Sequence, residues 1–272
     1  MIEFLKAVLF GIVEGITEWL PVSSTGHLIL LEEFVHLNVT AAFYELYQVV
    51  IQLGAILAVL VLFFHKLWPF SRKKSQLERK NTWTLWFKVV VAVLPSAVLG
   101  LLFDDFLDAH LYNYVVVSLM LIVYGVAFLL VERQAKSAKI TDVHQIDYRT
   151  ALFIGAFQCL SLIPGTSRSG ATILGALLLG VSRSAGAEFS FFLAIPTMLG
   201  ASALKLLKFL LEGNFPTQNE LLLLLTGCVV SFVVSLLVIK TLMDFVRKHS
   251  FAPFGVYRII LGAAVLLWFA LR

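Results

Sequence analysis

The sequence predicts an all-α protein that crosses a membrane several times, and its composition and its hydropathy pattern carry this prediction. Of its 272 residues, 60% are hydrophobic and only 14% are charged, whereas soluble domains carry about 25% charged residues. The mean hydropathy is +0.92, and the apolar residues fall into long stretches. Because lipid offers no hydrogen bonds to the backbone, apolar stretches of about 20 residues are typical of spanning helices.

Six stretches have the length and composition of a membrane span, and we expect them to form one integral membrane domain over residues 1–272. The length leaves no room for a separate soluble domain. The N-terminus does not read as a cleavable signal peptide, since Lys6 is its only basic residue. Cys159 and Cys228 lie in apolar surroundings, which favours buried free thiols over a disulfide or a metal site. The predicted spans are 46–64, 84–103, 111–131, 188–210, 221–241 and 255–271.

Two further apolar segments, 4–35 and 149–180, are interrupted by proline, glycine and runs of hydroxyl residues. A helix that faces lipid could not carry such breaks, because non-helical backbone at membrane depth needs protein or a water-filled cavity around it. We therefore predict that each segment is a re-entrant helix hairpin, which enters and leaves the membrane on the same side.

The charges of the connecting loops predict the orientation. Lys and Arg are concentrated in the 65–83, 132–149 and 243–254 loops, which marks these loops as cytoplasmic. The 36–44, 104–110 and 212–220 loops have neither residue, and Asp104, Asp105 and Asp108 make one of them acidic. Threading six spans and two hairpins then places both termini outside, with the first hairpin entering from outside and the second from inside.

An internal repeat accompanies this topology. Pro21 and Pro164 lie 143 positions apart (164 minus 21), and the same offset relates several other identical residues. Each half, about 1–135 and 145–272, contains one hairpin and three spans, so the odd number of spans predicts opposite orientations. Inverted repeats place their site near the midplane, where the broken helices meet. The other identical pairs are Phe10 and Phe153, Ser24 and Ser167, Glu45 and Glu188, and Tyr114 and Tyr257.

Glu14 and Glu18 are spaced i, i+4 in the first hairpin and therefore share one helix face. An ionisable residue at membrane depth is costly and marks a functional site by default. Two carboxylates on one face would repel each other without a cation, and Mg²⁺ and Ca²⁺ take oxygen ligands that include substrate phosphates. We expect the pair to bind one of these ions; the alternative is two glutamates that snorkel to the surface.

The motif P-V-S-S-T-G-H over residues 21–27 offers hydroxyl nucleophiles and an imidazole within one helical turn. A serine becomes a good nucleophile when an adjacent base takes its proton. We predict Ser24 as nucleophile with His27 as its base, and we assign Ser23 and Thr25 to substrate binding. The alternatives are a helix N-cap for the hydroxyl run and a core histidine for His27.

The motif P-G-T-S-R-S-G-A-T over residues 164–172 places Arg168 among hydroxyl side chains. A guanidinium fork surrounded by hydroxyl and amide donors suits a phosphate group, and a following helix N-terminus would add free N–H groups. The alternative is an arginine that snorkels to the cytoplasmic face. The hydroxyl residues assigned to substrate binding are Thr166, Ser167, Ser169 and Thr172.

Through these motifs the chain resembles, over essentially its whole length, the bacterial undecaprenyl-diphosphate phosphatase family, also called the bacitracin-resistance family. The resemblance implies a metal-dependent enzyme of the bacterial plasma membrane with a site that opens outward. Such an enzyme removes the terminal phosphate of a C55 polyprenyl diphosphate and so recycles the lipid carrier for peptidoglycan. It implies functional roles for Glu14, Glu18, Ser24, His27 and Arg168.

The residues leave several alternatives open. The attacking group could instead be water or His27, and an inverted repeat with broken helices is also the plan of a secondary transporter or a flippase of lipid phosphate or a small anion. The Ser–His and Glu–Glu pairs favour the enzyme, because transport needs no nucleophile. The expected partners are the polyprenyl diphosphate and membrane lipids, without nucleic acid, and a homodimer is one of the oligomeric states left open.

Overall fold

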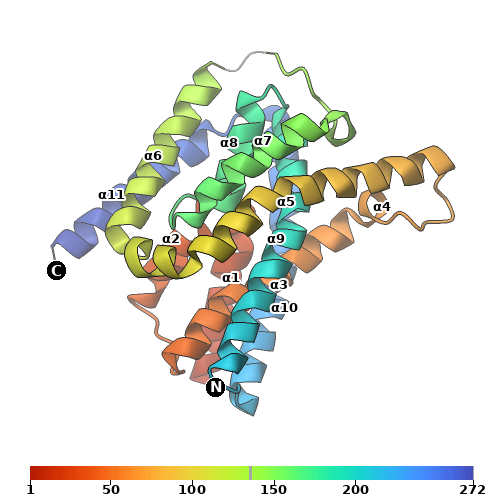
Figure 1. The fold of residues 1–272 in the computed structure, drawn as a ribbon. Helices are drawn as coiled ribbons and strands as arrows, with labels where there is room; N and C mark the ends of the chain where they lie inside the picture. Colours follow the sequence, from red (N-terminus) through yellow and green to blue (C-terminus); the bar gives the residue numbers. More distant parts are fainter. Residues whose placement is uncertain (135–136, 272) are drawn as a thin grey trace.

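The protein is described here by a computed structural model, which covers residues 1–134 and 137–271 (Figure 1). The described chain is helical, and its one β-type contact is an isolated bridge between Ile140 and Val181. The helices are α1 Ile2–Thr17, α2 Ser24–Glu32, α3 Ala41–Leu62, α4 Phe64–Leu67, α5 Gln76–Leu111, α6 Tyr114–Arg133, α7 Tyr148–Cys159, α8 Arg168–Leu178, α9 Arg183–Leu211, α10 Gln218–Lys248 and α11 Ala252–Ala270, with 3₁₀ turns η1 Val143–Gln145 and η2 Leu160–Leu162.

The prediction of six membrane spans is confirmed by length and composition. Among the described residues, six helices are long and apolar enough to cross a membrane, namely α3, α5, α6, α9, α10 and α11. One predicted loop is wrong, because α5 runs through 104–110 and ends only at Leu111. That stretch contains no Gly or Pro to stop the helix. The side chains of Asp104, Asp105 and Asp108 lie outside the described residues.

The two interrupted segments each form a helix, a short loop and a second helix. Pro21 and Pro164 stand in the loops, where the missing N–H prevents the helix from continuing. Ser23 and Ser167 then cap α2 and α8 by accepting the N–H of the glycine three residues later. Both serines have a left-handed backbone, with φ of 72° and 74°.

The positions of the two helix caps change the offset that aligns the two halves of the repeat here. Ser23 and Ser167 occupy the same structural place, so the offset here is 144 and not the 143 that paired Ser24 with Ser167. The second loop is one residue longer between its proline and its cap. Ser24 and Arg168 therefore stand at equivalent positions, as the first residues of α2 and α8.

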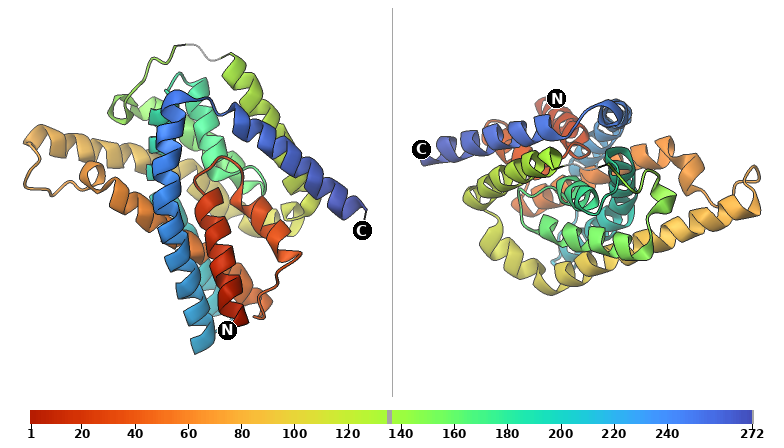
Figure 2. Two further views of the ribbon diagram at one scale, coloured as in Figure 1. Left: turned by 180° about the vertical axis from the view of Figure 1, so that it is seen from behind. Right: turned by 90° about the horizontal axis from the view of Figure 1, so that it is seen from above.

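Helices from the two predicted halves pack against each other. The first helix of each broken segment lies against a long helix of the other half, α1 against α10 and α7 against α5, and α6 lies beside α11 (Figure 2). Glycine permits these close crossings: a Cβ on Gly155 would lie 2.0 Å from the carbonyl oxygen of Ala92, and one on Gly11 would lie 2.7 Å from that of Gly227.

The connections between helices lie at two ends of the bundle. The N-terminus lies at the same end as the α9–α10 connection, and the η1 turn and the α10–α11 connection lie at the opposite end (Figures 1 and 2). Two of the three basic loops, 132–149 and 243–254, therefore lie at one end, and the orientation in the membrane stays a prediction.

Candidate active site

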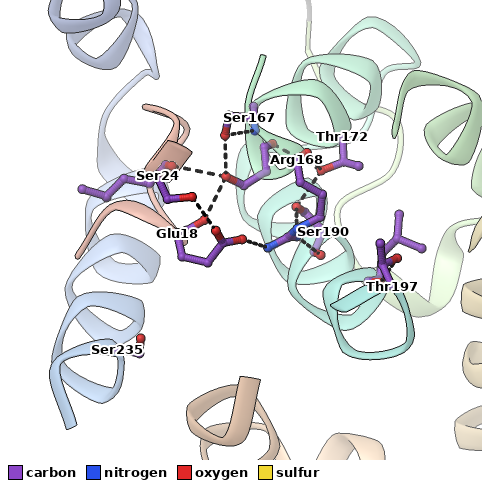
Figure 3. Close-up of polar contacts among 12 residues, drawn as sticks. Glu18, Ser24, Ser167, Arg168, Thr172, Ser190, Thr197 and Ser235 are labelled. Atoms are coloured by element: carbon purple, nitrogen blue, oxygen red, sulfur yellow. Dashed lines mark hydrogen bonds and ion pairs between the residues drawn. The ribbon is translucent and has the colours of Figure 1, made fainter. Parts of the chain in front are cut away.

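The two loops between the broken helices meet inside the protein, and the predicted motifs meet with them (Figure 3). Ser169, which is fully buried at the start of α8, fastens the loops together. Its hydroxyl lies within hydrogen-bond distance of the carbonyl oxygens of Glu18, at 3.1 Å, and Leu20, at 3.2 Å. Residues about 150 positions apart in the sequence therefore form one site.

Glu18 is the centre of this site. Its Oε2 accepts a hydrogen bond from the Ser24 hydroxyl at 2.9 Å, and its Oε1 accepts one from Arg168 Nη2 at 2.9 Å (Figure 3). The side chains of Glu18 and Arg168 are only 6% and 9% exposed, so water screens this ion pair weakly. One carboxylate thus connects the predicted nucleophile to the predicted phosphate-binding cation.

Arg168 is anchored on three sides. Its Nη1 donates to the carbonyl oxygen of Ser190 at 2.7 Å, with the Ser190 hydroxyl at 3.3 Å, and its guanidinium carbon lies 5.5 Å from the centre of the Trp19 ring. The snorkelling alternative is therefore wrong, because the side chain points into the protein. Ser190 and Trp19 were not predicted as site residues, although Trp19 directly follows Glu18.

Glu14 lies one turn before Glu18 and is fully buried. Neither of its carboxylate oxygens has a hydrogen-bond partner in the described structure. A buried carboxylate without partners is strongly unfavourable, so this geometry fits a ligand that brings positive charge. Both oxygens of Glu18 already have partners, and the described residues contain no cluster of three or more His, Cys, Asp or Glu suited to a metal.

His27 is held by a different set of contacts from those predicted. Its Nδ1 lies 2.7 Å from the carbonyl oxygen of Ser23, and its Nε2 lies 2.7 Å from the hydroxyl of Tyr257, with the two rings stacked. A carbonyl can only accept, so Nδ1 carries a proton and Nε2 of the neutral ring accepts from Tyr257. The predicted Ser24–His27 hydrogen bond is therefore wrong for this geometry, because Glu18 reaches Ser24 from the preceding loop.

The remaining predicted hydroxyl residues divide by their contacts. Ser23 serves as a helix cap, as the N-cap alternative for its hydroxyl run predicted, and Ser167 caps α8 in the same way. The hydroxyl of Thr172 lies 2.6 Å from that of Ser190 and also bonds the Arg168 carbonyl, so it supports the arginine. Thr166 is fully buried and its hydroxyl has no partner in the described structure, whereas Thr25 is half-buried beside Ser24.

Arg258 on α11 is a site residue that the sequence analysis missed. It is fully buried, and its guanidinium donates to the carbonyl oxygens of Pro21, Gly165 and Thr166, which belong to both loops. The signal that could have found it is its position inside the predicted span 255–271, because an arginine at membrane depth is a functional candidate.

Comparison with known proteins identifies relatives that share nearly the whole chain. The family model described as "Bacitracin resistance protein BacA" matches residues 7–264. An undecaprenyl-diphosphatase of Enterococcus faecalis is 60% identical over 270 residues, covering 98% of this chain and 97% of that protein. Another from Limosilactobacillus fermentum is 56% identical over 273 residues, covering 100% of this chain and 99% of that protein. The chain therefore belongs to the bacitracin resistance protein BacA family.

Proposed function

We propose that the protein is an undecaprenyl-diphosphatase, a membrane phosphatase that hydrolyses undecaprenyl diphosphate to undecaprenyl phosphate and phosphate. The proposal rests on the family and on relatives of that name. The observation that carries it is the buried arrangement in which Glu18 joins Ser24 to Arg168. A nucleophile, a proton acceptor and a guanidinium fork are the groups that phosphoryl transfer requires, since its catalysis is mainly positioning and charge stabilisation.

The geometry supports Ser24 as the nucleophile and Glu18 as its base. As the Ser24 oxygen attacks the terminal phosphorus, its proton passes to Glu18 Oε2, 2.9 Å away. The bond from phosphorus to the bridging oxygen breaks, undecaprenyl phosphate leaves, and water then cleaves the phosphoserine to release phosphate. Arg168 lies beside the same carboxylate and stabilises the negative charge on the transferred group.

His27 takes a different part in this scheme from the one that the sequence suggested. Its Nε2 accepts a hydrogen bond from the half-exposed Tyr257 at 2.7 Å, while its Nδ1 is fixed by the Ser23 carbonyl. We assign His27 and Tyr257 to proton transfer at the edge of the site. Direct attack by water in place of Ser24 is distinguished by trapping: only the serine route leaves a phosphate group on the protein.

A divalent cation, Mg²⁺ or Ca²⁺, fits the site at Glu14, whose unpartnered oxygens are the available ligands. Glu18 would share such an ion by exchanging one of its present partners. When bound, the ion would neutralise charge on the diphosphate. Without it, the buried Glu14 carboxylate would repel that group.

We further propose that the two broken segments are re-entrant hairpins in a single domain of two inverted halves, about 1–135 and 145–272. The equivalent caps Ser23 and Ser167 support this arrangement. Two ion pairs support it as well: Glu45 near the start of α3 pairs with Lys205 near the end of α9, and Glu188 near the start of α9 pairs with Lys66 on α4, which directly follows α3. With the basic loops in the cytoplasm, the site opens to the outer side of the bacterial plasma membrane.

The test is phosphate release from undecaprenyl diphosphate by the purified protein in detergent, with and without a chelator. Ser24→Ala should abolish release, whereas the control Ser161→Ala, whose hydroxyl only bonds the Gln158 carbonyl, should retain it. The absence of phosphate release from the folded wild-type protein would overturn the proposal. Movement of the lipid between leaflets of a proteoliposome without release would support the transporter alternative instead.

A further inference from the structure

Arg258 makes a set of contacts that no other residue of the site makes. Its Nη1 donates to the carbonyl oxygen of Pro21 at 3.0 Å, and its Nη2 donates to those of Gly165 and Thr166 at 2.9 Å each. Longer contacts of 3.4 Å reach the carbonyl oxygens of Met120 and Leu121 on α6. The Arg258 side chain on α11 therefore connects the loops of both halves of the protein to each other and to α6.

The charge of Arg258 has no carboxylate partner among the described residues, although the side chain is fully buried. Arg168 in the same site is paired with Glu18, and Arg183 at the start of α9, away from the site, is paired with Glu132. Burying an unpaired cation is costly. A lysine at this position would offer only three N–H donors, whereas the arginine guanidinium offers five in a fixed planar arrangement. The contacts of Arg258 therefore point to a role that depends on bridging carbonyl groups, with Tyr124 as an aromatic neighbour at 5.5 Å.

The carbonyl groups that Arg258 holds lie directly before the two strained helix caps. Pro21 precedes Ser23 by two residues, and Thr166 is adjacent to Ser167. A non-glycine residue with a left-handed backbone persists only where its surroundings hold it. Ser24 and Arg168 come next in the chain, so the bonds from Arg258 set where the two groups stand on either side of Glu18.

We propose that Arg258 is a positioning residue, which holds the loops 18–23 and 163–167 together so that Ser24 and Arg168 meet at Glu18. It acts through the backbone and touches none of the side chains that carry the chemistry in the proposed function, on which this inference rests. Since displacement of reacting groups by about 1 Å can cost about 10²-fold in rate, loss of these bonds should appear in kcat.

The experiment compares Arg258→Lys and Arg258→Met with the wild-type protein in detergent. The lysine keeps the charge and loses the fork, and it carries the test if the methionine variant does not fold. We expect amide hydrogen exchange to increase in both loops at once, kcat to fall by about 10²-fold and KM to stay within about 3-fold. Adding methylguanidinium to Arg258→Ala should restore part of kcat.

The matched control is Arg183→Lys, which alters a guanidinium at the start of α9 that is bonded to Glu132 near the end of α6. It should leave loop exchange and kcat unchanged. Unchanged exchange in the two loops of a folded Arg258→Lys protein, or a kcat equal to that of the wild type, would overturn the proposal. Because hydrogen exchange needs no turnover, failure of the proposed function is recognised separately, as a wild-type protein that releases no phosphate.

Discussion

Replacing Glu18 by glutamine tests the centre of the site, because the substitution keeps the shape of the side chain and removes its charge. Glutamine retains one carbonyl oxygen, so it can accept a hydrogen bond from Ser24 or from Arg168 but not replace both oxygens. Its amide group would face one of the two donors. Arg168, which is 9% exposed, would then be a buried cation without a counter-charge.

The size of the effect follows from this burial. Removing one partner of a buried ion pair costs about 3–5 kcal/mol, because the remaining charge is left uncompensated. Since glutamine keeps one of the two accepted hydrogen bonds, we expect the free energy of unfolding to fall by about 3 kcal/mol. We expect kcat to fall by at least about 10²-fold, because glutamine cannot take the proton of Ser24.

A double variant separates the two effects. Arg168→Met added to Glu18→Gln removes the uncompensated cation, so the unfolding free energy should recover by more than about 1 kcal/mol while kcat stays low. The measurements are titration with a denaturing detergent, followed by circular dichroism, and phosphate release from undecaprenyl diphosphate. The control is Glu132→Gln, which breaks the Arg183 pair elsewhere: it should lower stability and leave kcat near the wild-type value.

Two results would refute this account. If Glu18→Gln kept kcat within a few-fold of the wild type, Glu18 would not be the base. If the double variant were less stable than Glu18→Gln alone, with no positive coupling, the ion pair would not be the reason for the lost stability.

Further predictions concern the residues around Glu18 and the topology. Arg168→Lys should lower kcat by about 10²–10³-fold in a folded protein, because one ammonium cannot reach both Glu18 and the Ser190 carbonyl; near-native turnover would contradict the phosphate clamp. Tyr257→Phe removes the hydroxyl bonded to His27 Nε2 and should change the pH profile of kcat, whereas an unchanged profile would exclude the pair from proton transfer. Cysteine scanning should label a cysteine at the exposed Gln218 from outside and spare one at the exposed Lys73, from the Lys and Arg content of the 65–83 loop; the reverse pattern would contradict the orientation.

Site residues could be predicted from the sequence where ionisable residues lie within apolar segments. Glu14, Glu18 and Arg168 have no reason to stand in lipid-length stretches, and the structure buries all three inside the protein. The same argument applied to Arg258 would have found it, because that residue also lies within a predicted span. Arg258 was not predicted because it stands outside the two hydroxyl-rich motifs.

Local signals in the sequence were enough to determine the helices and their breaks. Span length and hydropathy depend on the bilayer thickness, and Pro21 and Pro164 remove the donors that a continuous helix would need. These effects act within a few residues of the chain, so no tertiary contact is required to predict them. Local signals alone were not enough at the end of α5, where nothing in 104–110 stops the helix before Leu111, nor at Pro95 and Pro196, which stand inside α5 and α9.

Only the tertiary structure decided which partners the polar groups take. Ser24 and His27 are one helical turn apart, yet Ser24 bonds Glu18 and His27 bonds Tyr257, from a helix some 230 residues away. The one-residue difference between the two loops, which makes Ser24 the counterpart of Arg168, shows in the backbone of Ser23 and Ser167. A hydrogen bond depends on distances of a few tenths of an ångström, and such distances follow from how the two halves pack and not from spacing along the chain.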